Sequence, residues 1–249
     1  MTTWWSPALL GILGLVFGSF IATLAIRWPQ RRSVAKGRSA CDSCDATLRA
    51  GELVPVVSHI LQRGRCRRCG APIAVSHLAT ELLGGAIGVT AGLIAPGWEG
   101  AAAAVFGWLL LALAAIDLAA FWLPNRLVAA LAVAGLGSAA LGVAPPPIDR
   151  LIGGLAGFAS LWLVAAGYRL LKGRNGLGGG DAKLFGAIGL WLGWRALPMT
   201  LLAACLLGLA VVVVLRVRGR RLGRTDRLPL GTLLAAVAFP IWCIAAMAG

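Results

Sequence analysis

Two aspartates in apolar surroundings are the residues of this chain best suited to catalysis. Asp117 lies inside an apolar run, and Asp181 follows the three glycines at 178–180 and leads into another apolar run. An ionised carboxylate within a bilayer costs about 3 kcal/mol, so it usually faces a cavity, a partner or a substrate path. Two carboxyl groups at one depth that share a proton provide one acid and one base for activating a water molecule. The pair therefore predicts the chemistry of an aspartic peptidase.

The residues beside Asp181 suit the binding of an extended peptide. Gly178 and Gly180 permit the backbone to bend and to approach a substrate closely, and Lys183 is placed to pair with Asp181 or with a lipid phosphate. Glycine clusters are also common in loops, so two alternatives stay open. In the first alternative, the two acids are relay residues of an ion-coupled transporter. In the second, they are buried acids whose hydrogen bonds are satisfied by neighbouring residues.

Three further titratable residues lie near the inner membrane boundary. Glu81 stands close to the start of the second apolar run, where a solvated, structural role is expected. His59 and His77 are the only two histidines of the chain. Both are expected to be solvated or to serve in packing, and neither lies within a span as a serine intramembrane peptidase would require.

Four of the six cysteines form two C-x-x-C pairs, Cys41 with Cys44 and Cys66 with Cys69. Two such pairs at this spacing provide four thiolates for a tetrahedral zinc ion. The basic residues beside the second pair are expected to lower the thiol pKa. Two disulfides and a redox role are the alternatives, and a reducing cytoplasm disfavours the disulfides. Since protein would fill every ligand position, the zinc is predicted to be structural.

The composition is that of a polytopic membrane protein. The 249 residues are 59% hydrophobic and 13% charged, with a mean hydropathy of +0.85, whereas soluble domains are about a quarter charged. We therefore predict an all-α membrane protein of about eight transmembrane helices. The predicted apolar runs are 6–26, 78–97, 100–122, 126–144, 151–168, 182–194, 197–215 and 229–248.

The basic residues give the orientation. With both termini outside, the segments between the runs place 21 of the 23 Lys and Arg residues on the inner side, as the positive-inside rule expects. Arg150 and Arg195 alone fall outside. The net charge of +14 then reflects topology, with some attraction to anionic lipid of the bilayer, and no nucleic-acid partner is predicted.

The chain divides into a first transmembrane helix at 1–26, a cytoplasmic zinc-binding domain at 27–76 and a membrane core at 77–249. About 50 residues with few large apolar side chains do not easily support a core, so the middle segment is expected to need a staple. No fixed-period repeat is expected.

Two inner segments of the membrane core have distinct expectations. Residues 169–180 are predicted to be a flexible glycine-rich inner loop, and the run 182–194 is short for a full span. Pro124 and Asn125 are expected to break the third membrane helix and form a tight inner turn.

Taken together, these motifs resemble those of the type IV prepilin peptidase family, membrane aspartic enzymes that process type IV prepilins and type II secretion pseudopilins. The resemblance covers most of the chain. The matching segments are Gly18-Ser19-Phe20, Arg27-Trp28-Pro29, the two C-x-x-C pairs with Val54-Pro55-Val56-Val57-Ser58 between them, Glu81-Leu82-Leu83, Asp117 with Leu123-Pro124-Asn125, Leu177 to Leu184, and Leu228-Pro229-Leu230-Gly231.

The resemblance implies that Asp117 and Asp181 hydrolyse a peptide bond at the cytoplasmic face of the bacterial inner membrane. The implied substrate is a prepilin or pseudopilin whose short basic leader is cut after a glycine. Family members with the cysteine domain usually also methylate the new N-terminus with S-adenosylmethionine. Glu81 is implied in that second site or in substrate handling.

Three positions depart from the family pattern. Ala22 replaces a frequent asparagine, Asp42 replaces a frequent proline, and Leu78 replaces the proline common three residues before the glutamate. All three lie near the segment linked to methylation, so they bear on methyl transfer more than on cleavage.

Overall fold

The protein folds as two compact units, Met1–Ala119 and Ala120–Gly249, and each is described by itself. The computed structural model describes residues 5–34, 38–173, 176–220 and 228–248. Parts of several predicted segments therefore lie outside the described residues, namely 1–4 of the first segment, 35–37 of the zinc-binding domain, 174–175 of the glycine-rich loop, 221–227 of the last basic segment and residue 249.

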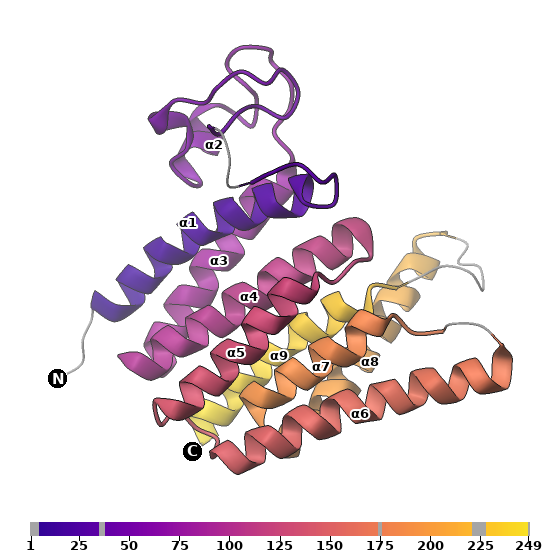
Figure 1. Cartoon of the computed structure of the whole chain (residues 1–249). Helices are drawn as coiled ribbons and strands as arrows, with labels where there is room; N and C mark the ends of the chain where they lie inside the picture. Colours follow the sequence, from indigo (N-terminus) through magenta and orange to yellow (C-terminus); the bar gives the residue numbers. More distant parts are fainter. Residues whose placement is uncertain (1–4, 35–37, 174–175, 221–227, 249) are drawn as a thin grey trace. The chain divides into compact units, whose positions relative to one another are not determined.

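Both units are helical, as predicted (Figure 1). Eight helices of 14 or more residues coincide with the eight predicted apolar runs, with ends that shift by a few residues. The first unit holds α1 (Trp5–Arg27), η1 (Ala50–Glu52), α2 (Val57–Leu61), α3 (Val75–Ile94) and α4 (Trp98–Ala120). The second holds α5 (Asn125–Ala140), α6 (Pro147–Lys172), α7 (Gly179–Leu192), η2 (Trp194–Ala196), α8 (Leu197–Val217) and α9 (Leu230–Ala248).

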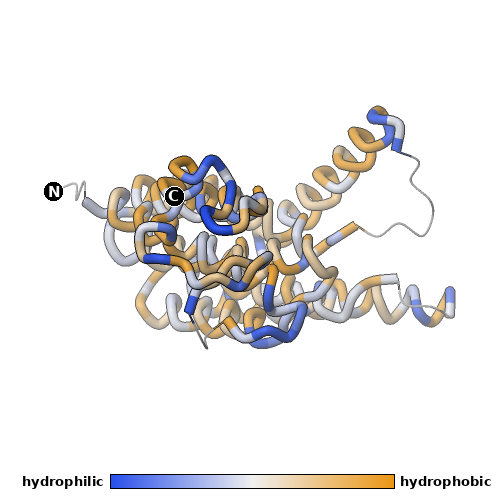
Figure 2. Tube along the Cα trace, turned by 90° about the horizontal axis from the view of Figure 1, so that it is seen from above, coloured by the Kyte–Doolittle hydropathy of each residue, from blue (hydrophilic) through white to orange (hydrophobic). Residues whose placement is uncertain are grey.

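Six of these helices are long and apolar enough to cross a membrane, and they are α1, α3, α4, α6, α8 and α9. The other two, α5 with 16 residues and α7 with 14, are shorter than the roughly 20 residues that a full span needs. The short seventh helix was expected from the run 182–194. Figure 2 shows the apolar trace along the helices and the polar trace in the cysteine-bearing segment and at helix ends.

Helices α1 and α3 pack backbone against backbone (Figure 1). A Cβ on Gly14 would lie 2.6 Å from the carbonyl carbon of Gly84, and one on Gly18 would lie 2.6 Å from the Cα of Glu81. Contacts this close need residues without side chains, as in other membrane helix pairs. The close-contact role expected for the Gly18-Ser19-Phe20 motif is confirmed, and its partner on α3 is the turn that carries Glu81.

Helix α4 docks on this pair through one tryptophan. The indole N–H of Trp108 donates to the carbonyl oxygen of Gly84 at 3.0 Å, and its ring lies 4.8 Å from that of Phe17. Because Gly84 exposes its carbonyl to a side chain in this way, α4 is fixed to the closest point of the α1–α3 contact.

Helices α6 and α7, in the second unit, also pack closely through glycines. A Cβ on Gly153 would lie 2.5 Å from the carbonyl oxygen of Gly189, and one on Gly157 would lie 2.8 Å from that of Phe185. The indole of Trp191 donates to the carbonyl oxygen of Leu131 at 2.8 Å, which ties α7 to α5. Helix α7 is therefore held on two sides.

A fully buried arginine joins the far ends of these helices. Arg150, on α6, has no exposed surface. Its guanidinium donates six hydrogen bonds of 2.8–3.0 Å, to the carbonyl oxygens of Pro145, Gly135, Leu190, Val143 and Ala144 and to the hydroxyl of Ser138. Helix C-termini carry unsatisfied carbonyls, so this single side chain caps backbone from α5, α7 and the loop before α6.

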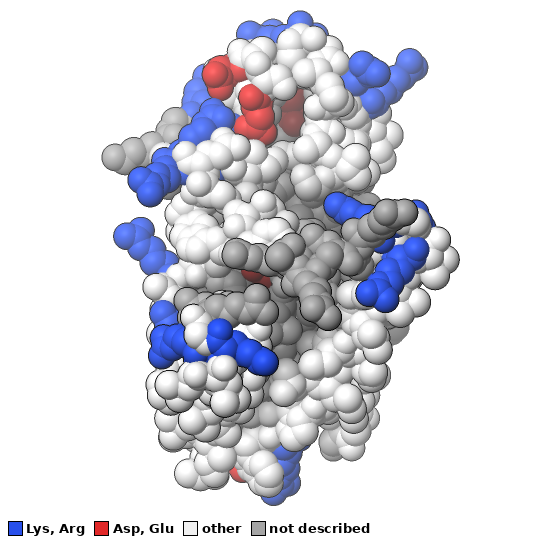
Figure 3. Space-filling model, turned by 90° about the vertical axis from the view of Figure 1, so that its right-hand side faces the viewer, with Lys and Arg blue, Asp and Glu red and all other residues white. Residues whose placement is uncertain are grey.

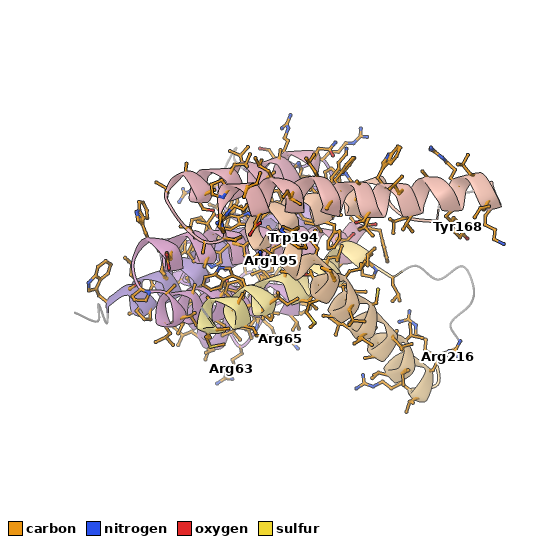
Figure 4. All side chains as sticks on the ribbon, turned by 90° about the horizontal axis from the view of Figure 1, so that it is seen from below. Arg63, Arg65, Tyr168, Trp194, Arg195 and Arg216 are labelled. Carbon is orange, nitrogen blue, oxygen red and sulfur yellow. The ribbon has the colours of Figure 1, made fainter. Side chains whose placement is uncertain are left out.

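The second basic residue predicted on the outer side is distant in sequence but lies at the same end of the second unit. Arg195 stands 5.5 Å from the ring centre of Trp194, and the indole of Trp194 donates to Asp149 at 3.0 Å. Figure 4 shows Trp194 and Arg195 together, at the other end of α8 from Arg216. The two exceptions to the positive-inside pattern are thus bound into one end of the second unit.

The inner glycine-rich loop is shorter than predicted. Helix α6 continues to Lys172 and α7 begins at Gly179, so the connection is 173–178 and not 169–180. The division of the chain at residues 26 and 76 stays a prediction.

Candidate active site and metal centre

Asp181 is buried in the first turn of α7, where it has 9% exposed surface. Gly178 is the N-cap of this helix, and a Cβ there would lie 2.9 Å from the Asp181 Oδ2. The glycine therefore leaves room for the carboxylate to fold back over the start of its helix. The positive end of the helix dipole stabilises such a charge by about 0.3–1 kcal/mol.

The turn that follows α4 packs against this glycine turn. A Cβ on Gly180 would lie 2.9 Å from the Cβ of Leu123, and the Lys183 ammonium donates to the Asn125 side-chain oxygen at 3.0 Å. The side chain of Lys183 was predicted to pair with Asp181 or with a lipid phosphate, and its protein partner is Asn125. The Leu-Pro-Asn motif and the Gly-Asp-Ala-Lys motif, 55 or more residues apart in sequence, thus meet within the second unit.

Asp117 is also buried, with 5% exposed surface, one turn before the end of α4. That helix ends at Ala120 because Phe121 takes a φ of +50°, a conformation that a bulky residue rarely adopts. Pro124 was predicted to break α4, but that helix has already ended at Ala120. Pro124 is instead the N-cap of α5. Asp117 and Asp181 belong to different units, and their pairing stays a prediction.

The four predicted ligand cysteines come together in the first unit. Their sulfur atoms all lie within 4.8 Å of one another, and those of Cys41 and Cys69 are 4.0 Å apart. A tetrahedral zinc with bonds of about 2.3 Å separates its sulfurs by about 3.8 Å. The donor set and its spacing therefore fit a metal ion. No disulfide joins these four cysteines, so the disulfide alternative is not the observed state.

The surroundings explain why this segment needs such a centre. Of the described residues between α1 and α3, Cys66 is the only buried one. Five large apolar side chains of the segment are exposed by 43–66%, and these are Leu53, Val54, Val57, Ile60 and Leu61. Leu48, Val56 and Ile73 are half-buried. The expectation that this segment lacks a core of its own is confirmed.

The two cysteine pairs are copies of one turn, offset by 25 residues. In the first, the N–H of Cys41 donates to Ala46 and that of Asp45 to Cys41. In the second, the N–H of Cys66 donates to Ala71 and that of Gly70 to Cys66, all at 2.9–3.0 Å. The bridges Ala40–Thr47 and Arg65–Pro72 keep the same offset. The copies match in backbone and hardly in sequence, because only the cysteines and the alanine two places after each pair are identical between them.

Backbone groups tune the thiols. The N–H groups of Cys69 and Arg68 stabilise the Cys66 thiolate and lower its pKa to about 7. The N–H of Ala46 lowers the pKa of Cys44, but the thiols of Cys69 and Cys41 and desolvation outweigh it and raise that pKa to about 11. The predicted lowering holds for Cys66, but through backbone N–H groups and not through the neighbouring arginine charges.

Glu81 is buried, with 6% exposed surface, so the solvated role expected for it is wrong. Its Oε2 accepts the backbone N–H of Val56 at 2.8 Å. Val56 has a φ of +62° and a ψ of −52°, and the N–H of Val57 donates to the Pro55 carbonyl at 2.6 Å. This is a γ-turn of the rare, strained hand, and positive φ is an outlier for a β-branched residue.

Sequence reasoning missed three features of these sites. It gave no role to Val56, to Asn125 as the partner of Lys183, or to Leu123 against Gly180. The only feature of the sequence that could have pointed to these three residues is that each lies inside a segment that resembles a family motif. Their contacts are long-range, so no local pattern announces them.

The comparisons with known proteins place both matched regions in one family. The model of the bacterial peptidase A24 N-terminal domain matches residues 12–94, and that of the type IV leader peptidase family matches residues 104–213. The chain is 40% identical over 252 residues to a prepilin leader peptidase/N-methyltransferase of Burkholderia pseudomallei (strain K96243), which covers 90% of this chain and 81% of that protein.

Two further relatives carry the same description. That of Aeromonas hydrophila is 41% identical over 172 residues, with 69% of this chain and 59% of that protein covered. That of Neisseria gonorrhoeae is 32% identical over 249 residues, with 85% and 83% covered. No solved structure matches the chain.

The chain is a multi-pass membrane protein, and it belongs to the type IV prepilin leader peptidase family. The two matched regions contain all the segments that carried the resemblance except 228–231. Membership favours the peptidase hypothesis over the ion-coupled transporter.

Proposed function

We propose that this protein cleaves the leader from type IV prepilins or type II secretion pseudopilins and then methylates the new N-terminus. The observation that carries the proposal is the 40% identity, over 90% of the chain, to a protein described as a prepilin leader peptidase/N-methyltransferase. The resemblance of the cysteine pairs, the glutamate and the two aspartate motifs points the same way.

Asp117 and Asp181 are the proposed catalytic pair. Both are buried acids on apolar helices. Support comes from the turn at 121–125, which begins four residues after Asp117 and contacts Gly180 and Lys183 on either side of Asp181. Gly178 and Gly180 form the active-site turn, and Lys183 holds that turn to Asn125.

The proposed reaction uses one water and one shared proton. The ionised carboxylate takes a proton from the water while the protonated carboxyl donates its own to the carbonyl oxygen of the scissile peptide. The hydroxide adds to the carbonyl carbon and gives a tetrahedral diol. As the C–N bond breaks, the first carboxyl passes its proton to the leaving nitrogen and the second recovers one from the diol, so both aspartates return to their starting states.

The proposed membrane arrangement follows from the charges. Both termini lie outside, α5 and α7 join the six longer helices within the bilayer of the bacterial inner membrane, and the cysteine-bearing segment is cytoplasmic. Twenty-one of 23 basic residues then face the cytoplasm. The active site lies at this cytoplasmic face, where a basic leader arrives.

The proposed metal is zinc. Four cysteine sulfurs within 4.8 Å of one another are a donor set that zinc takes in structural sites. Cys41, Cys44, Cys66 and Cys69 would hold it, and its role there is to fasten the two turns together. The proposed methyl donor is S-adenosylmethionine, consistent with the methyltransferase described among the relatives.

The test is to express a prepilin together with each variant and to analyse the mature N-terminus by mass spectrometry. Asp117→Asn and Asp181→Asn are expected to lower cleavage by about a thousandfold or more, as loss of a catalytic residue does. Asp149→Asn is the matched control, because Asp149 is a half-buried acid in the first turn of α6, in the same unit as Asp181 and bonded to Trp194. Cleavage retained by both active-site variants would reject the proposal.

A further inference from the structure

Within the part of the chain that the structure describes, one side of the short helix α2 is apolar and exposed. Val57, Ile60 and Leu61 are spaced i, i+3 and i+4, so they share that side of the helix. Their side chains are exposed by 50–66%, and those of Leu53 and Val54, just before α2, are exposed as well. These five side chains form the α2 surface, and exposed apolar surfaces of this kind mark contacts with proteins or membranes.

The other side of α2 is polar and faces the protein. Ser58 and His59, together with Gln62 just after the helix, are half-buried and line a cavity of about 650 Å³ that α1 and α3 also line. Helices of soluble domains bury their apolar side and expose their polar side. The order is inverted in α2, as it is expected to be in a helix whose outer side meets lipid and not water.

Helix α3 gives the depth of this segment along the membrane helices. Its 20 residues rise by about 30 Å, which is the thickness of the hydrocarbon core, so α3 has no length to spare outside that core. Glu81 lies six residues, or about 9 Å, past the first residue of α3, and its carboxylate accepts the N–H of Val56 at 2.8 Å. Because helical side chains lean toward the N-terminus, Val56 lies between that depth and the membrane boundary.

Helix α1 gives a similar depth. Ser19 lines the same cavity as Ser58, and it lies eight residues, or about 12 Å, before the inner end of α1 at Arg27. Figure 1 shows α2 alongside α1 and not past its end. The segment therefore folds back along the two helices, and α2 begins at the level where headgroups meet acyl chains.

Basic residues flank the α2 surface in the sequence. Arg49 precedes it, Arg63 and Arg65 follow it, and all three are exposed. Figure 3 shows Lys and Arg side chains around a few acids at the cysteine-bearing end of the first unit, and Figure 4 labels Arg63 and Arg65. Arginine stems lie along apolar surface while the charged group reaches the headgroup level, where a guanidinium pairs with phosphate. The charge is therefore complementary to an anionic lipid surface.

We propose that the α2 surface inserts into the inner leaflet at the boundary between acyl chains and headgroups, and that the three flanking arginines bind anionic lipid there. Interfacial helices bury their apolar side about 5–10 Å deep in this way. The cysteine-bearing segment lacks an apolar core of its own, and lipid supplies the burial that the protein does not. Insertion also supports the strained turn at Val56, because Val57 begins the inserted helix. The inference rests on the proposed arrangement in the membrane and not on the proposed cleavage.

Photoreactive lipid tests this proposal. The purified full-length protein is placed in phosphatidylcholine nanodiscs with a phosphatidylglycerol probe that carries a diazirine near the top of its acyl chain, and labelled peptides are mapped by mass spectrometry. Label is expected on α1 and within 53–61. A phosphatidylcholine probe of the same design is expected to label 53–61 about threefold less, since it has no net charge for the arginines to attract.

Two outcomes contradict the proposal. Label on α1 with none in 53–61 overturns it and assigns the α2 surface to a protein partner, which is either a second copy of this chain or the substrate. Equal labelling of 53–61 by the two probes overturns the role given to the arginines.

A matched pair of variants isolates the apolar contact. Ile60→Asp and Leu93→Asp each place a charge at an exposed side chain, 64% exposed in the α2 surface and 63% exposed at the opposite end of α3. Ile60→Asp is expected to lower label within 53–61 about tenfold, because a charge resists entry into the acyl region, and Leu93→Asp is expected to leave that label unchanged. The melting temperature of Ile60→Asp in detergent is expected to match that of the unchanged protein, since the Ile60 side chain is not buried. Unchanged label in Ile60→Asp overturns the proposal.

Discussion

Two helix pairs, α1–α3 and α6–α7, use the same packing and differ in what they hold. Each pair brings backbones together through glycines, at Gly14 and Gly84 in one and at Gly153 and Gly189 in the other. Each also carries a buried acid near the start of its second helix. Close glycine packing therefore fixes both acids on rigid supports, which a catalytic or binding group requires.

The difference lies in what each acid faces. Glu81 receives the N–H of a strained turn from the cysteine-bearing segment, whereas Asp181 lies over the N-cap glycine of its own helix. The first acid connects the cysteine-bearing segment to the helices α1 and α3. The second depends on local chain geometry and on the turn at Leu123. Glu81 thus makes its long-range contact with its own side chain, whereas the long-range contacts beside Asp181 are made by Gly180 and Lys183.

Removal of the metal is the largest expected effect, and it acts on one helix pair only. Structural zinc contributes about 10–16 kcal/mol of apparent binding energy in small fingers, and no buried apolar core replaces it in the described residues between α1 and α3. We expect a chelator to speed amide exchange across 38–73, including Val56, and to leave α6–α7 unchanged. Hydrogen exchange with mass spectrometry measures this. Unchanged protection of 38–73 would contradict the staple.

A leucine in either glycine contact is the next largest effect. Gly14→Leu and Gly153→Leu place a side chain where backbone already lies, so each is expected to lose about 3 kcal/mol or more of stability, at or above the upper end of overpacking costs. Gly137→Leu on α5 is the control, because a Cβ there meets open space. Thermal unfolding in detergent measures all three. A stable Gly14→Leu protein would show that the helices are not in backbone contact.

Loss of the buried arginine tests the far end of α6–α7, which has no counterpart in α1–α3. Arg150→Met leaves five carbonyl oxygens without their donor, and unsatisfied buried groups cost about 1–3 kcal/mol each before relaxation. We expect a loss of about 2–4 kcal/mol. Arg195→Met, at an exposed side chain, is expected to change stability by under about 0.5 kcal/mol. Similar melting temperatures for both variants would argue against the capping role.

The smallest expected effect compares the two copied turns. Gly70 has a φ of +71° and its equivalent, Asp45, a φ of +51°. Gly70→Ala is expected to cost about 1 kcal/mol, since alanine disfavours that conformation. Gly51→Ala is the control, as its φ is ordinary and its surroundings are open. Zinc retention during a chelator titration reports the difference. Equal zinc retention by the two variants would show that the positive φ at Gly70 does not contribute to the stability of the site.

Hydropathy alone predicted the helices. Eight apolar runs became eight helices because a bilayer rewards continuous apolar length, and the shortness of α7 was visible in its run. The cysteine cluster followed from spacing. These features depend on composition along the chain and on no distant partner.

The burial of polar side chains could not be predicted, because it depends on residues that are distant in the sequence. The burial of Arg150 needs carbonyl groups from five separate positions, and the burial of Glu81 needs the glycine surface of α1 and the turn at Val56. The positive-inside rule could only mark Arg150 as an exception. The structure explains this exception, because backbone carbonyl oxygens and not water accept the hydrogen bonds of the Arg150 guanidinium.

The 25-residue copy of the cysteine turn has a consequence for assembly. Neither copy alone supplies more than two sulfurs, so an ion is captured only when the chain between them has curled into a closed ring. That ring contains Val56. Closing the ring lowers the conformational entropy of this stretch of chain, so less entropy is left to lose when Val56 bonds to Glu81. Metal capture and the docking of the ring on the membrane helices are thereby linked thermodynamically, so that each event makes the other more favourable.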